Sequence, residues 1–511
     1  MLNEITKTAL LLVSVCCILV GNNNAKADSD YLVVSFVSAE SEYSEAARLL
    51  AERHDAQTVY SSLYKFDELK EKLLELQPQT VAFIVKPEDL QVNFVEQILV
   101  LSTQMDFDPF VDFSYGFITG RDAKAAVNLV RASASQKQFD SPAITMFGVG
   151  PDSMGDSRKQ EAAWPIGKMM VPVKTLQSAG ERDETRDESF IETALPELEG
   201  SPILLLASHG YPTGLVGGLK AADIRDRDFT GSVALNIACY NGVTGTWFED
   251  DWSTKTVQQR QVDQSESFCL QMIDNGVAAY FCYVTPRPAG PNMLGDALVV
   301  ASSGKSVGQL RMEDANRMIL AHLMTGDDRL QITPMSTGQE IQLDRTPGDI
   351  VKRMSTGGIL IGDPAFEPFG PAENADPQQQ NVENTDTGMI VETKIKSPIQ
   401  HMFTSEQINY WENTSPAMRV ETMLMLDDQA IEEVRILEAP GEQYHFVAAV
   451  ELRDGERWLR FKLTTPRKMD PETFRKHATS GVAVKFEVVF GDPLADQASD
   501  LKIIRGSKLK D

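Results

Sequence analysis

Positive charge is scarce in this chain of 511 residues, in which 48 Lys and Arg face 74 Asp and Glu and the formal net charge is −26. Proteins that bind nucleic acid or adhere to anionic lipid depend on clustered Lys and Arg, so the composition argues against both classes. The acidity would favour a cationic substrate, although a charge excess usually reflects only a solvated surface. We therefore expect no nucleic-acid partner.

Hydrophobic runs long enough to span a membrane are also lacking. The apolar run at residues 8–20 is shorter than the ~20 residues of a membrane-spanning helix. Lys7 precedes this run and a polar stretch ending in Ala-Lys-Ala follows it, which is the order of a secretory signal peptide. We predict that residues 1–27 are this signal, and that the mature protein is secreted or lies in the periplasm or cell envelope, without a membrane span.

Cysteine is rare, with five residues in all. Cys16 and Cys17 lie within the signal, and lipid attachment there is disfavoured because a small residue normally precedes a lipid-modified cysteine. The remaining Cys239, Cys269 and Cys282 form an odd and sparse set for a compartment that favours disulfides. Apolar neighbours predict that Cys269 and Cys282 are buried hydrophobic residues or form one disulfide. The presence of a further cysteine, Cys239, therefore requires another explanation than burial or a disulfide.

The sequence from residue 31 to about 370 alternates short β-rich runs with amphipathic helical stretches. This alternation predicts an α/β fold in which helices cover a parallel sheet. The length exceeds the ~100 to 200 residues of one domain, so we divide this part into an N-terminal α/β subdomain, 28–138, and a catalytic α/β subdomain, 139–370.

The composition changes after residue 370. Residues 371–388 are poor in apolar residues and are predicted to be a flexible linker. Residues 389–511 contain alternating apolar and polar segments, with Asp454 and Gly455 suited to a tight hairpin turn. This region is predicted to be an all-β sandwich of about immunoglobulin size.

Two apolar runs end in a chemically reactive residue type. ILLLASHG ends with His209, and VALNIACYNG contains Cys239. Ligands of open α/β sheets bind at the carboxyl ends of the strands, so both residues are expected at the same edge. An imidazole within reach of a thiol stabilises the nucleophilic thiolate. The other five histidines lie in helical stretches or in the outer β region, so the sequence offers one catalytic pair.

The sequence around this pair resembles the gingipain family of cysteine peptidases, in the caspase and gingipain clan. An apolar block followed by His-Gly, and a later apolar block ending in Ala-Cys, is the clan's pattern. The family's Ala-Cys-x-Asn-Gly is similar to residues 238–242, and its closing Gly-Asp-Pro is similar to residues 362–364. DFSYGFITGRDA and GVAAYFCYVTPRPAG also look like family segments, so the resemblance covers about residues 30–370.

The resemblance implies a caspase-like, parallel-sheet catalytic region of two subdomains, followed by an immunoglobulin-like sandwich. It implies a secreted cysteine endopeptidase acting on proteins or peptides, with Cys239 as nucleophile and His209 as thiol partner and proton donor. The backbone N–H groups of Gly210 and Cys239 would receive the developing oxyanion. The family orients its histidine with an upstream acid, and Asp152 is the nearest carboxylate in the corresponding stretch.

The loop after the strand GVAAYFCYV is expected to form one wall of the substrate pocket. Thr285 and Arg287 lie in this loop, and Arg287 could favour an acidic substrate residue. The alternative is that Arg287 is a solvated loop cation, which is the usual environment of arginine. The basic-residue specificity of some family members is not carried over to this chain.

Other interpretations remain open at this point. Taken singly, His209 and Cys239 could be a satisfied core histidine and a buried cysteine. A gingipain-like binding or assembly protein of the cell envelope, without turnover, is the alternative function. Peptide ligation through the same thioester is a third.

No cofactor is required by this chemistry, and no metal is expected in the catalytic site. The string Ser-Gly-Lys-Ser at residues 303–306 fails as a phosphate-binding loop because Val299 occupies the position of the first glycine. The acidic run Glu249-Asp250-Asp251 offers oxygens that suit a structural calcium ion, but the absence of dedicated ligand spacing favours a solvated loop.

Overall fold

The fold of the chain is available as a computed structural model. It describes residues 30–63, 65–134, 139–150, 157–179, 186–251, 253–286, 293–340, 356–373, 378–395, 419–453, 455–465, 481–494 and 501–508. The predicted signal, 1–27, with Cys16 and Cys17, lies outside these residues. Within them, no helix is both long enough and apolar enough to cross a membrane.

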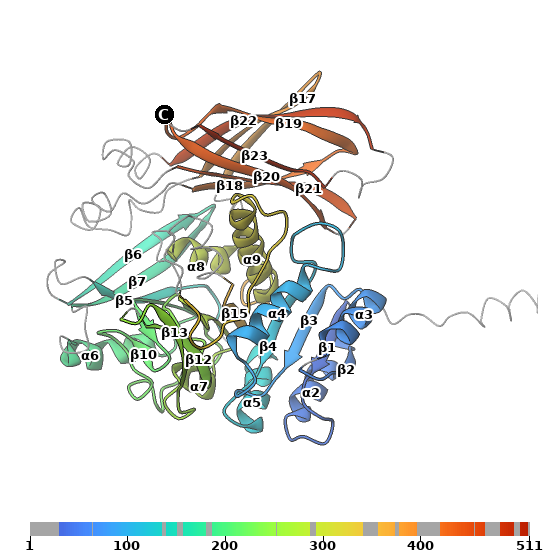
Figure 1. Cartoon of the computed structure of the whole chain (residues 1–511). Coiled ribbons are helices and arrows are strands. Elements are labelled where there is room, and N and C mark those ends of the chain that lie inside the picture. The colour runs from blue at the N-terminus through green and yellow to red at the C-terminus, as the bar shows by residue number, and fades with distance from the viewer. Residues whose placement is uncertain are drawn as a thin grey trace, which may run out of the picture.

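One mixed sheet of 11 strands forms the centre of the α/β part, in the order β2-β1-β3-β4-β15-β14-β11-β8-β5-β7-β6 (Figure 1). The first five are mutually parallel: β2 (Gln57–Tyr60), β1 (Tyr31–Ser35), β3 (Thr80–Ile84), β4 (Ser114–Ile118) and β15 (Gly358–Gly362). The next five are also parallel to one another: β14 (Ala279–Tyr283), β11 (Val233–Asn236), β8 (Ile203–Ala207), β5 (Ile144–Gly150) and β7 (Met169–Ala179).

The α/β class is confirmed, while the expectation of a wholly parallel sheet is corrected. β14 and β15 pair antiparallel and join the two parallel blocks into a single sheet. β6 (Arg158–Ile166) pairs antiparallel with β7 at one edge. β15, from late in the chain, adds to the first block, so the division at residues 138 and 139 does not separate two sheets.

Helices cover both faces of the sheet, as side chains along β8 show. Ile203 and Leu205 belong to an apolar cluster with residues of α8, whereas Leu204 and Leu206 belong to another cluster with residues of α6. Successive strand residues point to opposite faces, so the two helices lie on opposite sides. The helices are α2 (Ser44–His54), α3 (Phe66–Leu76), α4 (Val92–Ser102), α5 (Ala123–Ala134), α6 (Glu188–Leu198), α7 (Phe268–Asp274), α8 (Met293–Ser302) and α9 (Val307–Leu323).

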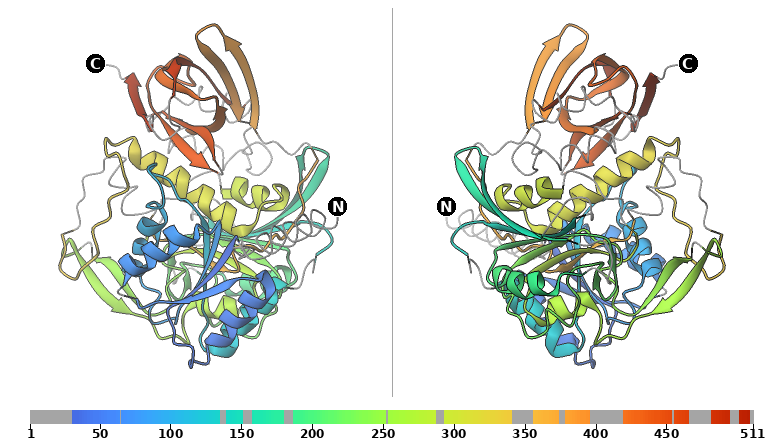
Figure 2. Two further views of the ribbon diagram at one scale, coloured as in Figure 1. Left: turned by 90° about the vertical axis from the view of Figure 1, so that its right-hand side faces the viewer. Right: turned by 90° about the vertical axis from the view of Figure 1, so that its left-hand side faces the viewer.

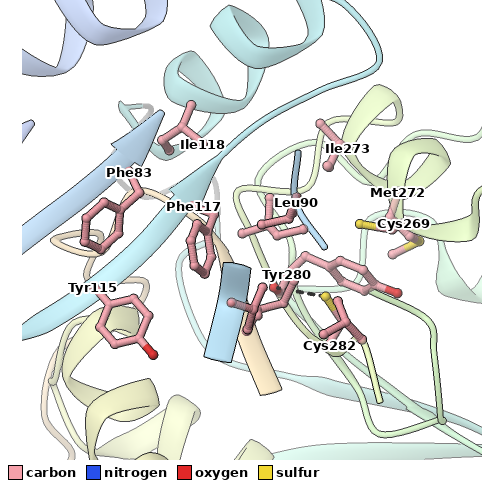
Figure 3. Close-up of a cluster of buried hydrophobic side chains, with 14 of the residues drawn as sticks. Phe83, Leu90, Tyr115, Phe117, Ile118, Cys269, Met272, Ile273, Tyr280 and Cys282 are labelled. Carbon is pink, nitrogen blue, oxygen red and sulfur yellow. Dashed lines mark hydrogen bonds between the residues drawn. The ribbon is translucent and has the colours of Figure 1, made fainter. Parts of the chain in front are cut away.

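Cys269 and Cys282 are both free and fully buried (Figure 3). Burial raises the pKa of the Cys282 thiol well above its usual value, and the neighbouring Cys269 raises it further. Tyr280 and Met272 lie in the same apolar cluster. The prediction of buried hydrophobic cysteines is confirmed, and the alternative of a disulfide between them is not.

The C-terminal region is a sandwich of two antiparallel four-stranded sheets, β16-β17-β22-β19 and β18-β21-β20-β23. Phe486 of one sheet stacks on Phe461 of the other, with ring centroids 4.1 Å apart. The strands are β16 (Gln378–Thr385), β17 (Gly388–Ile395), β18 (Arg419–Leu426), β19 (Gln429–Glu438), β20 (Tyr444–Arg453), β21 (Glu456–Thr464), β22 (Val482–Pro493) and β23 (Ile503–Lys508). The all-β region is thus confirmed, and its immunoglobulin-like character stays a prediction.

Two local expectations can be compared with this region. Arg453 pairs with Glu456 and Gly455 has a φ of 77°, in agreement with the predicted hairpin turn. Residues 371–388, predicted to be a flexible linker, instead contain β16. This strand is exposed and pairs only with β17 at the edge of its sheet, so it does not show the apolar alternation of a half-buried strand.

The sandwich is fastened to α9, which lies between it and the central sheet (Figure 2). Glu313 of α9 pairs with Arg453 at 2.7 Å and with Arg460 at 3.0 Å. Burial would raise the pKa of Glu313, but these arginines outweigh it and lower the pKa to about 2. Asn316 of the same helix donates to Glu451 at 3.1 Å. The junction is therefore held by charge-assisted hydrogen bonds as well as apolar packing.

Asp363, just after β15, ties the end of that strand to β1 and α2. Its carboxylate accepts hydrogen bonds from the Tyr31 hydroxyl at 2.9 Å and from Arg53 at 3.0 Å, and it contacts the His54 ring at 2.9 Å. Burial would raise the pKa of Asp363, but the His54 contact and the other hydrogen bonds outweigh it, so the pKa lies below its usual value. The Gly-Asp-Pro motif thus has a structural role here.

We predict that Asp363→Asn lowers the free energy of unfolding at pH 7 by about 2 kcal/mol, the range for hydrogen bonds to a charged group. Because the folded-state pKa is lowered, this stabilisation is present above the unfolded pKa of about 3.9 and is lost as the pH falls through the folded value. Urea unfolding from pH 7 to pH 3 should show the gap between wild type and variant closing below about pH 4. A gap that stays constant would contradict this assignment.

Candidate active site

His209 and Cys239 follow two adjacent strands. β8 and β11 pair in parallel with Leu206 opposite Asn236, and the Ile237 N–H donates to the Leu206 carbonyl at 3.0 Å. His209 comes two residues after the end of β8, and Cys239 comes three residues after the end of β11. The structure therefore brings both residues to the same carboxyl edge of the sheet.

The segment that carries His209 lies directly against the segment that carries Cys239. A Cβ atom at position 210 would lie 2.7 Å from the Ala238 Cβ and 2.7 Å from the Cys239 carbonyl oxygen. Real Cβ atoms do not approach other atoms this closely, so only glycine fits this position. Gly210 thus allows the close contact between the two segments.

Cys239 differs from the other described cysteines in accessibility. Cys269 and Cys282 are buried, whereas Cys239 is partly exposed and His209 is exposed. The strands leading to both residues are buried throughout. The two side chains therefore lie at the surface beyond the ends of buried strands, which contradicts the alternative of a core histidine and a buried cysteine.

The loop after Cys239 makes a sharp turn. Tyr240 has a φ of 60°, which is unusual for a residue with a side chain and is kept only where neighbours hold it. Its N–H donates to the Thr285 carbonyl at 3.3 Å, and the Gly242 N–H donates to the Tyr283 carbonyl at 2.8 Å. The Tyr240 ring packs edge-on against Trp247, with centroids 4.6 Å apart. The chain therefore turns back along β14 immediately after Cys239.

The backbone near His209 forms a small hairpin, β9 (Gly210–Tyr211) with β10 (Gly214–Leu215). The Val216 N–H donates to the His209 carbonyl at 2.9 Å, and the Leu215 N–H donates to Leu219 at 2.7 Å. Gly210 and Leu215 are thus a non-hydrogen-bonded pair, in which the N–H of each residue points away from the other strand. This geometry is compatible with the predicted use of the Gly210 N–H as an oxyanion donor.

The remaining predicted site residues are distributed differently. Thr285 has a relative exposure of 1%, and a Cβ at position 357 would lie 2.4 Å from its Oγ1, so its side chain packs against Gly357. Its carbonyl supports the loop after Cys239, as described above. Asp152 and Arg287 lie outside the described residues, and their predicted roles stay predictions.

Three buried polar residues form a hydrogen-bond network next to Cys239 and were not predicted as site residues. Asn236 and Asn241 are connected to each other and to the hydroxyl of Tyr280 by hydrogen bonds. Asn241 is part of the Ala-Cys-x-Asn-Gly motif, which was the one sequence feature that could have identified it. Tyr211, between His209 and the hairpin turn, is 50% exposed and was also missed.

Two groups of carboxylates were considered as cation ligands. Glu249 and Asp251 belong to β12 (Thr246–Asp251), which pairs with β13 (Thr256–Gln261); Glu249 accepts from Arg260 at 3.0 Å and Asp251 caps a local turn. Among the described residues, a three-carboxylate group lies before β4, with ligand atoms within 4.8 Å of one another: Asp106, Asp108 and Asp112. Asp108 accepts from Leu452 of the sandwich at 2.7 Å.

Comparisons with known proteins found solved structures of low similarity and no sequence match. No protein family and no curated protein matches the sequence. The complex of Porphyromonas gingivalis RgpB pro- and mature domains is similar over 89% of this chain and 99% of that chain, with a TM-score of 0.39 and 9% identity. A structure described as a protease is similar over 93% of this chain and 96% of that chain, with a TM-score of 0.35 and 10% identity. Both TM-scores are below 0.5, so the chemistry must be argued from the site itself.

We predict that Gly210→Ala leaves the fold intact but separates the two segments of the site. The added Cβ meets backbone of the loop after β11, so the hairpin must move, and a displacement of about 1 Å can cost about 100-fold in rate. Alkylation of Cys239 at neutral pH, measured with thermal unfolding as the control for folding, should slow by at least about 10-fold in this variant. An unchanged alkylation rate would show that the contact is not needed.

Proposed function

We propose that the mature chain is an exported cysteine endopeptidase, in which Cys239 attacks the peptide carbonyl and His209 serves as its proton partner. The observation that carries the proposal is the contact at Gly210, which holds the segment of an exposed histidine against the segment of the one accessible cysteine among the described residues. Convergence of these two residue types at a strand edge is the arrangement that nucleophilic thiol catalysis needs.

The reaction follows from the residues. His209 takes the thiol proton, the Cys239 Sγ bonds to the carbonyl carbon, and the N–H groups of Gly210 and Cys239 stabilise the oxyanion. As the peptide C–N bond breaks, the imidazolium returns its proton to the leaving amine and a thioester remains. Water, deprotonated by the neutral imidazole, then hydrolyses the thioester and restores the thiol. An acid that orients His209, proposed to be Asp152, would raise efficiency without changing these steps.

The proposed partners are therefore protein or peptide substrates, and the proposed location is outside the cytoplasm after removal of residues 1–27. The gingipain-like arrangement of two subdomains and an immunoglobulin-like sandwich belongs to the same proposal. Arg287 is proposed to favour an acidic substrate residue. No cofactor is needed for this chemistry.

We predict that Cys239→Ala and His209→Ala each lower peptide cleavage by at least about 10³-fold, the scale for losing a nucleophile or its base. The test incubates the chain from Asp28 onward with a diverse peptide library under reducing conditions. Cys269→Ala is the matched control, because it removes a buried thiol and should leave the cleavage profile unchanged. Identical cleavage by wild type and Cys239→Ala would refute the proposal.

A thiol-reactive probe separates this function from a binding protein that lacks turnover. We expect iodoacetamide to label Cys239 at neutral pH at a rate that depends on His209. An inert Cys239, or labelling that is identical in His209→Ala, would favour the binding protein of the cell envelope.

A further inference from the structure

The side-chain amide of Asn241 connects the two halves of the proposed site. Its Nδ2 donates to the Tyr211 carbonyl at 2.5 Å and to the Gly214 carbonyl at 3.2 Å, both in the hairpin that follows His209. The same Nδ2 contacts the Cys239 carbonyl at 3.3 Å. One fully buried amide therefore binds the histidine segment and the cysteine segment at once.

The orientation of this amide is fixed by a second layer of hydrogen bonds. Asn241 Oδ1 accepts from Asn236 Nδ2 at 2.6 Å, and that Nδ2 also donates to the Tyr280 hydroxyl at 2.8 Å. The Tyr280 hydroxyl donates to the Asn241 carbonyl at 3.2 Å. A reversed amide would place Oδ1 against three carbonyl oxygens, and would place Nδ2 against the amide nitrogen of Asn236. Only the observed orientation satisfies the network.

Asn241 and Gly210 fit together sterically. A Cβ at position 210 would lie 2.8 Å from Asn241 Nδ2, so the amide occupies the space that any larger residue at 210 would take. The Asn236 Oδ1 accepts the Ala238 N–H at 3.0 Å, which holds the residue preceding Cys239 to the end of β11. Hydrogen bonds made by buried side-chain amides do not compete with water, so their geometry is well defined.

We propose that Asn241 is a positioning residue, which holds the His209 hairpin against the Cys239 loop so that the imidazole can activate the thiol. The inference rests on the proposed function, because it concerns how that pair is kept in reach. Asn241 acts through the backbone on both sides and transfers no proton itself. Its loss should therefore change the ionisation of Cys239 only as long as His209 is present.

The test is the pH profile of Cys239 alkylation by iodoacetamide in the mature chain. In wild type we expect an apparent thiol pKa below the ordinary value of about 8.5, which the imidazole makes possible. Asn241→Ala should move the apparent pKa toward about 8.5 and slow alkylation at neutral pH by at least about 10-fold. Thermal unfolding before alkylation verifies that each variant is folded.

Asn275→Ala is the matched control. Asn275 is another buried asparagine whose Nδ2 donates to a backbone carbonyl, that of Ile224, and whose Oδ1 accepts from Gln271 at 3.0 Å. These partners are distinct from those of the His209 hairpin and the Cys239 loop, so Asn275→Ala should lower the thermal stability without changing the thiol profile. If it shifts the profile as much as Asn241→Ala, a general loss of rigidity explains both and the proposal is overturned.

Tyr280→Phe provides a second variant that does not depend on Asn241→Ala folding. This variant removes the hydroxyl that supports Asn236 and Asn241 but keeps the contacts of Asn241 Nδ2. The apparent pKa of the Cys239 thiol should therefore shift in the same direction as in Asn241→Ala, but by less. A folded Asn241→Ala with the wild-type profile, or a Tyr280→Phe with no shift when Asn241→Ala does not fold, overturns the proposal.

A double variant separates positioning from a direct effect on the thiol. In a His209→Ala background, Asn241→Ala should cause no further shift, because the imidazole whose position it controls is gone. A full additional shift would mean that Asn241 acts on Cys239 alone, which contradicts the proposal. If the wild-type thiol already titrates near 8.5 and ignores His209→Ala, the proposed function fails and this inference fails with it.

Discussion

The parallel register of β8 and β11 is the constraint on which the site depends. With Leu206 opposite Asn236, the two strands end at the same level, and the segments that leave them must run side by side. Both strands are buried on both faces, so a slip by one residue would move every side chain into the packing of the opposite face, where the neighbouring side chains differ in shape. The position of His209 relative to Cys239 is thus determined by the core, and the local loops only complete it.

β14 supports the loop that carries Cys239 from the other side. β11 stops at Asn236, and beyond that point the N–H groups of Gly242 and Tyr240 donate to the carbonyls of Tyr283 and Thr285. This return along β14 requires the left-handed turn at Tyr240, whose strain is offset by its packing on Trp247. Thr285, expected in the pocket wall, is better understood as part of this support, since its side chain is buried against Gly357.

The elements with strong sequence patterns were predictable, and those set by distant partners were not. The strands around His209 and Cys239 and the all-β character of the last region follow from local periodicity and turn chemistry. The antiparallel joint between β14 and β15 did not, because pairing direction depends on where the rest of the chain runs. β16 was missed because an exposed edge strand can consist almost entirely of polar residues. The structural role of Asn241 was not predicted because its partners come from β9, β10, β11 and β14 and from Cys239.

The three described cysteines differ in burial, and burial decides what chemistry a thiol can perform. Cys282 lies within β14 beside Cys269, where burial raises the pKa of its thiol and leaves it a small hydrophobic residue. Gly242, three residues after Cys239, packs so closely that a Cβ there would lie 2.9 Å from the Cys282 sulfur. The buried Cys282 side chain therefore packs against the loop that carries the accessible Cys239. Among the described cysteines, Cys239 alone lies beyond a strand end and is partly exposed, and accessibility of this kind is what a reactive thiol requires.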